Sequence, residues 1–280
     1  QTCALPISSE QVSDGHPDKM CDQVSDAIID ALIEQDAYAR GGVETLIKNN
    51  TVIVAGEATS SAEIDYQAVA LKALSEIGWD DEETGFDPKT AIFQKLVFQQ
   101  SKEIEDAVVK DGDDEKLGAG DQGMMVGYAT NETPQFLPTT LVFATLLLLE
   151  MKKLRQSGAI KWLMPDVKSQ VTVEYEKDDK GHLKVNRVHT VLISTQHRDG
   201  VSNEEITETL IREVVKKVIP EKLIDSETRF FINPSGSFIV GGPQGDCGIT
   251  GRKIIADTYG GWGGHGGGAF SGKDPTKVDR

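Results

Sequence analysis

The sequence predicts an α+β fold built from similar two-layer units, each a sheet covered on one face by helices. Two observations lead to this prediction. Apolar residues recur at helical spacing in several segments, and a pair of strands followed by an amphipathic helix occurs twice along the 280 residues. The composition, 38% hydrophobic and 26% charged, is typical of a globular protein that buries a core.

The first helix is predicted to begin near Pro17, because proline is favoured at the first position of a helix. Apolar residues then recur every three or four positions and give this helix one buried face. A second apolar run, Leu141 to Leu149, has about half the ~20 residues that a membrane span needs, so a buried helix is expected there. The apolar residues of the first helix are Met20, Val24, Ile28, Ala31 and Leu32.

A hairpin followed by an amphipathic helix is predicted at two places. In the first, Asn49-Asn50 forms the turn, since asparagine tolerates the positive φ of a tight hairpin. In the second, Ser202 and Glu205 form the capping box of the helix and Pro220 ends it. The first copy comprises strands at 43–48 and 51–58 and a helix at 62–77 capped by Ser61; the second comprises strands at 170–175 and 183–195 and a helix at 203–218, followed by strands at 228–233 and 238–240.

Charge and cysteine content narrow the class of protein. The formal net charge of −16 argues against nucleic-acid binding, whose affinity comes largely from Lys and Arg on phosphates. Three cysteines without CxxC spacing predict reduced thiols in a cytoplasmic protein, with neither a disulfide framework nor a zinc site. No secretory signal and no membrane partner are expected. Residues 1–7 (QTCALPI) resemble translated adapter sequence and are expected to be non-native and outside the fold.

Glycine is concentrated late in the chain, where fourteen of the 28 glycines lie between positions 236 and 272. The same part of the chain is locally basic, and glycine lets backbone N–H groups approach a phosphate closely. A small polyanion site is therefore the favoured interpretation, with a chance charge fluctuation as the alternative. Residues 267–273 match GxxxxGK, but Asp274 replaces the Ser/Thr of a P-loop and no strand precedes it, so a P-loop is rejected.

Asp274-Pro275 is expected to open a helix, whose N-terminus would favour an anion beside Lys273 and Lys277. His265 is a loop residue of the same segment, and whether it lines the site is left open. Three further histidines, in or near the second hairpin, are assigned no chemistry: His182, His189 and His197.

Four aspartates at four-residue spacing share one face of the first predicted helix. Asp18 stands beside a histidine at the helix start, and it is the favoured candidate for Mg²⁺, which takes oxygen ligands and only one or two carboxylates. Further along the helix, Asp26 and Asp30 are expected to form a solvated acidic face. Asp121, held between glycines, indicates by itself no more than a turn.

Seven separated segments resemble the S-adenosylmethionine synthetase (methionine adenosyltransferase) family, from about residue 8 onward. The resemblance implies three similar, intertwined α+β domains: an N-terminal domain at 8–105, a central domain at 116–234 and the start of a C-terminal domain at 235–280, truncated so that this domain is mostly missing. The segments are SSEQVSDGHPDKMCDQVSDAIIDA (8–31), GEATSSA (56–62), GAGDQGMMVGYATNET (118–133), PDVKSQVTVEY (165–175), STQH (194–197), GGPQGDCGITGRKIIADTYGG (241–261) and HGGGAFSGKDPTKVDR (265–280).

The reaction that this resemblance implies is the attack of the L-methionine sulfur on C5′ of ATP, with triphosphate as the leaving group. The triphosphate is then cleaved to pyrophosphate and phosphate. The implied cofactors are Mg²⁺ and K⁺, and the implied assembly is a homodimer or homotetramer with active sites between subunits. Sulfur is already a competent nucleophile, so the chemical need is for fixed cations that stabilise the charge on the departing triphosphate.

The resemblance also implies the site residues, position by position. The catalytic residues are His16, Lys168, Arg252 and Lys273. The ATP-binding residues are His16, Asp166, Lys168, Ser237, Phe238, Asp246, Arg252, Lys253, Ala269 and Lys273. The methionine-binding residues are Glu57, Gln100, Asp121, Asp246 and Lys277. The metal ligands are Asp18 and Asp279 for Mg²⁺ and Glu44 for K⁺.

Two positions depart from the family pattern, since Met164 and Ser237 stand where the family usually has arginine. Ser237 removes a fixed charge from the nucleotide segment. Two alternatives to the adenosyltransferase therefore stay open. One is a catalytically silent homologue or fragment that serves as an assembly subunit, and the other is a simple polyphosphate hydrolase.

Overall fold

The computed structural model describes residues 4–80, 82–99, 101, 118 and 122–279. The chain divides into two compact units, and each unit is assembled from three separate stretches of sequence. Unit 1 comprises Gln1–His16, Val126–Gly241 and Ile255–Gly264; unit 2 comprises Pro17–Met125, Gly242–Ile254 and His265–Arg280. Early and late parts of the sequence thus contribute to both units.

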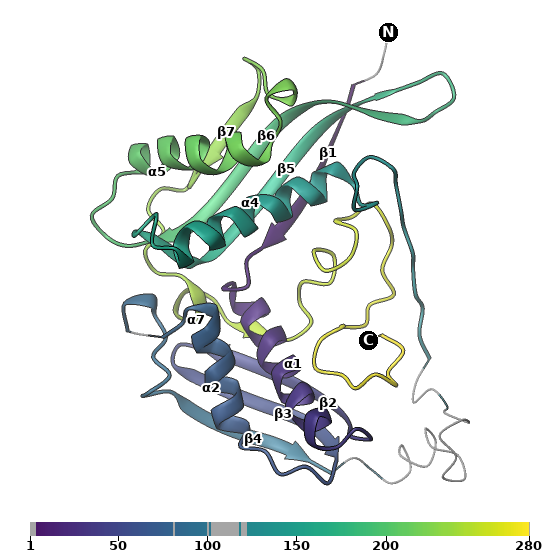
Figure 1. The fold of residues 1–280 in the computed structure, drawn as a ribbon, viewed down its shortest axis with the longest axis vertical. Coiled ribbons are helices and arrows are strands. Elements are labelled where there is room, and N and C mark those ends of the chain that lie inside the picture. The colour runs from purple at the N-terminus through teal and green to yellow at the C-terminus, as the bar shows by residue number, and fades with distance from the viewer. Residues whose placement is uncertain (1–3, 81, 100, 102–117, 119–121, 280) are drawn as a thin grey trace. The chain divides into compact units, whose positions relative to one another are not determined.

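Unit 2 contains a four-stranded sheet in the order β4-β3-β2-β8. β2 (Arg40–Lys48) and β3 (Thr51–Thr59) form an antiparallel hairpin, and β4 (Ile92–Phe98) runs parallel to β3. The fourth strand, β8 (Gly248–Ile249), has two residues and pairs with β2. Helices α1 (Pro17–Gln35) and α2 (Tyr66–Ile77) cover one face of the sheet (Figure 1). A 3₁₀ turn, η1 (Glu82–Thr84), and a short helix, α7 (Gly242–Gly245), complete the regular structure.

The hydrophobic core of unit 2 lies between its helices and its sheet. Met20, Val24, Ile28 and Leu32 of α1 are buried as predicted, whereas Ala31 is half-buried. Their partners include Val43 and Ile47 of β2, Val52 and Val54 of β3, Leu74 of α2 and Trp79. The inward residues of β2 and β3 alternate with outward ones, as a sheet with one covered face requires.

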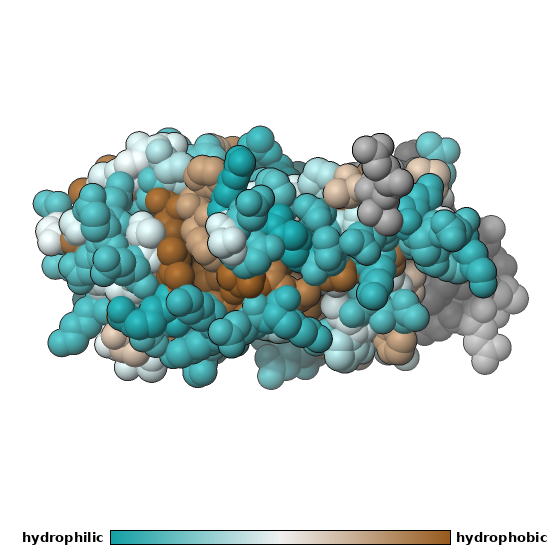
Figure 2. Space-filling model, turned by 90° about the horizontal axis from the view of Figure 1, so that it is seen from above, coloured by the Kyte–Doolittle hydropathy of each residue, from teal (hydrophilic) through white to brown (hydrophobic). Residues whose placement is uncertain are grey.

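Unit 1 contains a second four-stranded sheet, in the order β1-β5-β6-β7. β5 (Leu163–Lys177) and β6 (Leu183–His197) form a long antiparallel hairpin, β7 (Arg229–Ile232) runs parallel to β6, and β1 (Ala4–Val12) pairs with β5 over nine positions. Its helices are α4 (Thr139–Gln156), α5 (Asn203–Leu210), a π-helical turn η4 (Ile211–Val215), α6 (Lys216–Val218) and a 3₁₀ turn η5 (Glu221–Leu223). Seen from above, the surface is mostly hydrophilic, with a band of hydrophobic residues among the hydrophilic ones (Figure 2).

The two units share one order of elements: helix, hairpin, helix, and a strand parallel to the second strand of the hairpin. The order is α1-β2-β3-α2-β4 in unit 2 and α4-β5-β6-α5-β7 in unit 1. In each sheet the fourth strand comes from a distant part of the chain and pairs antiparallel with the first strand of the hairpin. The α+β fold class and the repeated hairpin-plus-helix unit are therefore confirmed.

Several local predictions are confirmed and others are wrong. Asn49 has a φ of 50° in the β2–β3 turn, and the Ser202 hydroxyl accepts a hydrogen bond from Glu205 N, as expected at a cap. The predicted start of the second helix is wrong: α2 begins at Tyr66 and is capped by Asp65, while Ser61 donates to the Asp36 carboxylate.

Three further differences concern the ends of unit 1 segments. Residues 238–240 do not form the predicted strand. The helix predicted over 141–149 is part of α4, and Leu149 on its outer side is exposed. Residues 4–7, expected outside the fold, belong to β1, where Leu5 and Ile7 pack on the core; their non-native origin stays a prediction. Among the helices of the described residues, none is long and apolar enough to cross a membrane.

Candidate functional site

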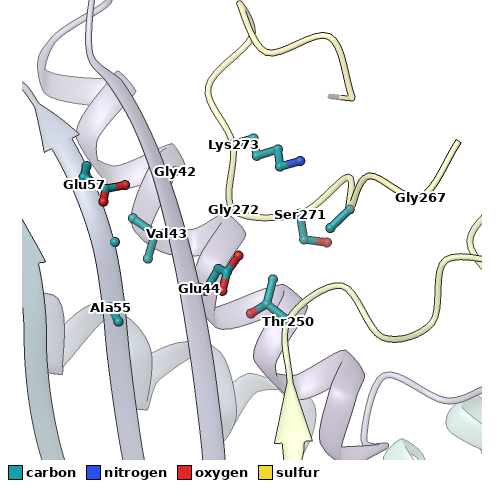
Figure 3. A pocket seen from close by; sticks show the side chains of 12 residues that line it. Gly42, Val43, Glu44, Ala55, Glu57, Thr250, Gly267, Ser271, Gly272 and Lys273 are labelled. Atoms are coloured by element: carbon teal, nitrogen blue, oxygen red, sulfur yellow. The ribbon is translucent and has the colours of Figure 1, made fainter. Parts of the chain in front are cut away.

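Unit 2 contains two glycine-rich stretches from late in the sequence, 242–254 and 265–279, which are together called the late segment. A cavity of ≈ 500 Å³ opens where the β2–β3 hairpin meets this late segment (Figure 3). Two carboxylates from the hairpin, Glu44 and Glu57, and the ammonium-bearing Lys273 lie along its wall. The lining thus combines charged side chains of both signs with glycine residues, which expose only backbone atoms. The lining residues are Gly42, Val43, Glu44, Ala55, Gly56, Glu57, Thr250, Gly267, Ala269, Ser271, Gly272 and Lys273.

The hairpin presents its carboxylates because of its register and its glycines. Glu44 is paired with Ala55, and Glu57 is paired with Gly42. A Cβ atom on Gly42 would meet nothing within 4 Å, so its absence widens the open space of the wall. Gly56 has a φ of +141°, and a Cβ there would lie 2.1 Å from Gly42 O. The close approach of the two strands therefore requires glycine at position 56.

The base of the cavity is fixed by buried hydroxyl groups. Thr250, a lining residue, donates its backbone N–H to Thr45 O at 3.0 Å, and Thr45 N donates to Thr250 Oγ1 at 2.8 Å. Ser25 Oγ of α1 lies 2.8 Å from the hydroxyl oxygen of each threonine. Helix, strand and late segment are thus joined by one polar network beneath the open space.

Lys273 is held on the edge of β2. It forms an isolated antiparallel bridge with Gly42, and its Nζ donates to Asp279 Oδ2 at 2.8 Å. Asp274, 1% exposed, accepts from Gly41 N and from Thr276 N, each at 2.8 Å. The predicted helix after Asp274 is wrong for the residues described up to 279, because they form turns; Asp274 caps a turn there instead.

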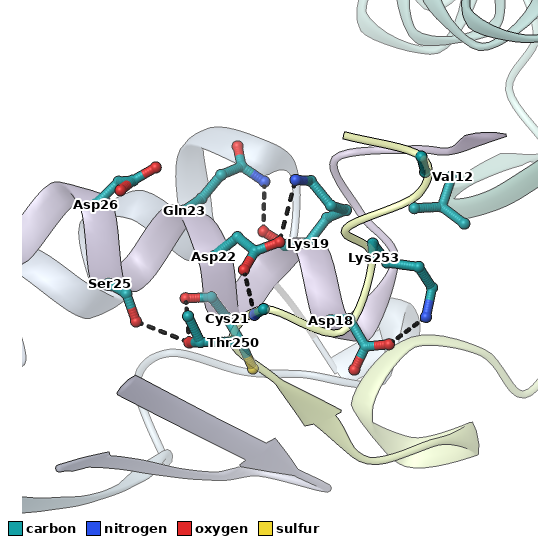
Figure 4. A network of polar contacts seen from close by, with 12 residues as sticks. Val12, Asp18, Lys19, Cys21, Asp22, Gln23, Ser25, Asp26, Thr250 and Lys253 are labelled. Atoms are coloured by element: carbon teal, nitrogen blue, oxygen red, sulfur yellow. Dashed lines mark hydrogen bonds and ion pairs between the residues drawn. The ribbon is translucent and has the colours of Figure 1, made fainter. Parts of the chain in front are cut away.

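Two aspartates of α1, Asp18 and Asp22, point to the late segment (Figure 4). Asp18 Oδ1 accepts from Ile249 N at 2.9 Å, and its Oδ2 forms an ion pair with Lys253 Nζ. The Asp22 carboxylate accepts from Gly251 N and pairs with Lys19 at 3.1 Å. Asp18 and Asp22 are buried, in keeping with these contacts.

The solvated acidic face predicted for Asp26 and Asp30 holds for one residue only. Asp30 is exposed. Asp26 is half-buried and accepts a hydrogen bond from Gly272 N at 2.8 Å, so the prediction for Asp26 is wrong. The physical reason is that a distant segment covers this helix turn, which helical periodicity cannot reveal.

Unit 1 brings three predicted residues to one end of its sheet. Val12, the last residue of β1, pairs with Lys168 of β5, and the chain then turns back over the start of β5. Ser13 fixes this turn, since its N donates to Val167 O and its Oγ donates to Pro165 O at 2.7 Å. The turn ends at His16, which is buried, beside the β5 residues that flank the buried Asp166. Lys168 itself is exposed.

Ser237 and Phe238 lie at the same end of that sheet, where β6 finishes. Phe238 N donates to His197 Nε2 at 3.0 Å, and His197 N donates to Phe238 O at 3.0 Å. Because Nε2 accepts, the proton of the neutral ring is on Nδ1, which lies 2.8 Å from Arg198 O. His197, to which the sequence assigned no chemistry, thus fixes the backbone of a predicted nucleotide residue. Ser237 is exposed.

The remaining predicted residues are less constrained or lie outside the described part of the chain. Arg252 and Asp246 of unit 2 are exposed, and Lys277 is half-buried. His265 does not line the cavity; its Nδ1 accepts from Gly267 N at 2.7 Å. The predictions for Gln100 and Asp121 fall outside the described residues.

A buried thiol lies beneath the Asp18–Lys253 pair. Cys21 is fully buried on α1, and burial, followed by the nearby Asp18 and Asp22 carboxylates, raises its pKa well above the ordinary value. A Cβ on Gly248 would lie 2.9 Å from Cys21 Sγ, so β8 packs directly on the thiol. Cys21 is therefore a packing residue of this unit.

Among the described residues, no group of three or more His, Cys, Asp or Glu side chains is arranged to hold a metal ion. Mg²⁺ often takes only one or two protein carboxylates and completes its shell with water and substrate phosphates. Asp18 and Asp279 each offer such a carboxylate, and each is now neutralised by one lysine ammonium group, from Lys253 and Lys273. The donor chemistry fits a hard cation.

Comparison with protein families matches three consecutive stretches of the chain. The N-terminal domain model of S-adenosylmethionine synthetase matches residues 5–102, the central domain model matches residues 116–238, and the C-terminal domain model matches residues 240–280. Together these matches cover most of the sequence and include all the site residues named above.

Proposed function

Since the chain belongs to the S-adenosylmethionine synthetase family, we propose that it is an ATP:L-methionine S-adenosyltransferase. The methionine sulfur attacks C5′ of ATP, the C5′–O bond breaks, and triphosphate leaves; water then cleaves the triphosphate to pyrophosphate and phosphate. The observation that carries the proposal is the unit 2 cavity, where Lys273 stands opposite the carboxylates of Glu44 and Glu57 on a glycine-lined wall.

Two lysines support the polyphosphate part of the proposal. Lys253 and Lys273 are each oriented by an aspartate, Asp18 and Asp279 respectively. An ammonium group that is already held in place costs little reorganisation when charge develops on the leaving oxygen, and such preorganised charge is a large contribution to catalysis. In this proposal the two lysines, with Arg252, bind the phosphates of ATP.

Metal ions belong to the proposal through the same carboxylates. Asp18 and Asp279 would hold Mg²⁺, and Glu44 would hold K⁺. When bound, the cations neutralise phosphate charge.

The remaining contacts complete the substrate assignment. Glu57, exposed on the cavity wall, supplies a carboxylate for the methionine ammonium group, and Lys277 supplies a positive charge for its carboxylate. In this proposal Asp246 of unit 2 binds both substrates. The ATP-binding residues of unit 1 are His16, Asp166, Lys168, Ser237 and Phe238. Gln100 and Asp121 remain predictions for methionine.

A homodimer or homotetramer with active sites between subunits is also proposed. The support is the edge strand β4 of the unit 2 sheet, which exposes large apolar side chains at Ile92 (65%), Leu96 (39%) and Phe98 (69%). A soluble monomer gains nothing from such a row, whereas a partner subunit would bury it. The three-domain division at 8–105, 116–234 and 235–280 and the cytoplasmic location stay predictions.

The test is product formation from ATP and L-methionine by the purified protein with Mg²⁺ and K⁺. The proposal expects S-adenosylmethionine and phosphate to appear together and to depend on methionine. Detecting neither product would favour a silent assembly subunit. Phosphate release from triphosphate with no S-adenosylmethionine under any condition would favour a polyphosphate hydrolase.

A further inference from the structure

The middle of α1 contacts the segment that carries Lys273. Asp26 Oδ1 accepts a hydrogen bond from the backbone N–H of Gly272 at 2.8 Å, across 246 residues of sequence. Asp26 continues the row of Asp18 and Asp22, each of which also accepts one backbone N–H from the late segment. A hydrogen bond to an ionised carboxylate is about twice as strong as one between neutral groups. The row therefore ties the late segment to the helix at three points.

Gly272 is held from its other side by β2. Its carbonyl accepts from Val43 N at 2.7 Å, and its φ is +72°. A Cβ at this position would lie 1.9 Å from Val43 O and 2.8 Å from Ser25 Cβ. The residue is thus wedged between α1 and β2, and it leaves room for backbone only.

Lys273 follows directly, between two anchored neighbours. Asp26 holds the preceding residue, and the buried Asp274 on the other side bonds Gly41 through both its side chain and its backbone N–H. A lysine side chain has many rotamers, so a fixed Cα restricts the positions that its ammonium group can reach. The cavity wall gives Lys273 such a fixed Cα.

We propose that Asp26 is a positioning residue: its carboxylate holds the Gly272 amide and thereby fixes Lys273 in the cavity. This inference rests on the proposed function, in which Lys273 binds the polyphosphate. Asp26 does not line the cavity, so it acts through Lys273. The competing view is that Asp26 only stabilises the fold.

The first experiment measures the anchor itself by hydrogen–deuterium exchange of peptides that contain Gly272. Asp26→Ala removes the acceptor, whereas Asp26→Asn keeps a side-chain oxygen that can accept the same N–H. We expect exchange to rise about tenfold in the alanine variant, the scale for losing a charge-assisted hydrogen bond, and to rise less in the asparagine variant, which keeps a neutral acceptor. Asp30→Ala, one turn later and exposed, is the matched control. Unchanged exchange in Asp26→Ala would overturn the proposal.

The second experiment asks whether Asp26 acts through Lys273, by a double-mutant cycle. The readouts are kcat and the Kd for inorganic triphosphate. In the Lys273 background, Asp26→Ala should lower kcat about tenfold, since a displacement of about 1 Å can cost up to 10²-fold, and should weaken triphosphate binding, with the KM for methionine unchanged. In the Lys273→Ala background the same change should alter both readouts less than about twofold. Equal losses in both backgrounds would mean a purely structural role.

The two hypotheses fail separately. If wild-type protein makes no S-adenosylmethionine, the proposed function is wrong, while exchange and triphosphate binding still decide the role of Asp26. If Lys273→Ala leaves triphosphate binding unchanged, the positioning role is overturned even where exchange shows the anchor. Thermal unfolding of every variant shows whether a loss of kcat or of triphosphate binding comes from unfolding. If Asp26→Ala is unfolded, Asp26→Asn is compared with wild type instead.

Discussion

The two units place the same elements in the same order, yet they treat the open edge of the hairpin differently. In unit 1 the edge strand β1 pairs with β5 at nine positions, from Val12 to Ala4. In unit 2 the corresponding strand β8 pairs with β2 at two positions only, Leu46 with Ile249 and Ile47 with Gly248. The rest of the β2 edge receives the glycine-rich segment through the Gly42–Lys273 bridge.

The shortened edge strand makes room for a site. In unit 1 the regular strand β1 occupies this edge of the sheet. In unit 2 the corresponding edge is occupied by irregular backbone that carries Lys273, and a cavity of ≈ 500 Å³ opens there, lined also by Glu44 and Glu57. A regular strand would present alternating side chains along this edge and would leave no such concavity. In unit 2 a distant glycine-rich segment thus lies along the part of the edge that a longer strand occupies in unit 1, and a cavity opens there.

The largest expected effect comes from removing the positive charge of Lys273 at the edge of β2. Lys273→Ala should lower kcat by about 10²-fold or more, the scale for losing one oriented transition-state contact. Single-turnover formation of S-adenosylmethionine measures it. Lys184→Ala, at an exposed position of the unit 1 hairpin, is the control and should leave the rate unchanged. A Lys273→Ala rate equal to wild type would mean that the phosphates bind elsewhere.

The next prediction concerns Asp274, which anchors the irregular backbone at the edge of β2; replacing it leaves the Lys273 charge in place. Asp274→Ala leaves the Gly41 and Thr276 amides without their acceptor in a buried position, which should lower the free energy of unfolding by about 2 kcal/mol. Urea unfolding followed by circular dichroism provides the value. The exposed Asp179→Ala should fall within about 0.5 kcal/mol of wild type, as is usual for surface changes. A loss no larger than that of Asp179→Ala would contradict the anchoring role of Asp274.

A third test separates the proposed metal role of Asp18 from its structural role. Asp18→Asn keeps an acceptor for Ile249 N but removes the negative charge beside Lys253. We expect the Mg²⁺ concentration for half-maximal rate to rise about tenfold, equivalent to about 1.4 kcal/mol of lost binding. Asp30→Asn should leave it unchanged. An unaltered Mg²⁺ titration in Asp18→Asn would refute the assignment.

The smallest effect concerns the packing beneath β8. Because burial raises the pKa of Cys21 above its ordinary value of 9.0, the native protein keeps this thiol protonated at a pH where an unfolded chain ionises it. Its contribution to stability is therefore full below pH 9 and is lost as pH rises above that value. Peptide mapping after iodoacetamide at pH 8 should show half-exposed Cys247 modified and Cys21 spared until denaturant is added. Equal modification of both in the native state would mean that β8 does not cover Cys21.

Local chemistry predicted much of the fold. Residues that act on their own backbone neighbours can be interpreted from the sequence alone. Examples are Pro17 at a helix start, Asn49 in a turn and Ser202 at a cap. β8 was missed because two residues carry no periodicity, and the extra pairing of residues 4–7 was missed because strand partners lie far away. Asp65 replaced Ser61 as a cap because Ser61 is occupied by Asp36.

The site could be predicted only in part. Charge and glycine content pointed to a polyanion site around Lys273, and the family resemblance named three more cavity residues, Glu44, Glu57 and Ala269. The contacts of Asp26 with Gly272 and of His197 with Phe238 could not be predicted, because each joins positions that only the tertiary fold brings together.

The interleaving of the two units has a consequence for how the chain acquires its structure. Ser9 bonds Gly260 across 251 positions, and Asp18 pairs with Lys253 across 235. At a synthesis rate of about 5–20 residues per second, helix α1 leaves the ribosome many seconds before its partners exist. Its row of carboxylates and the apolar residues beside it must stay soluble and unpaired through that interval. Such distant pairings also make folding slow, so we expect chaperone dependence to be greatest for variants that weaken the late segment.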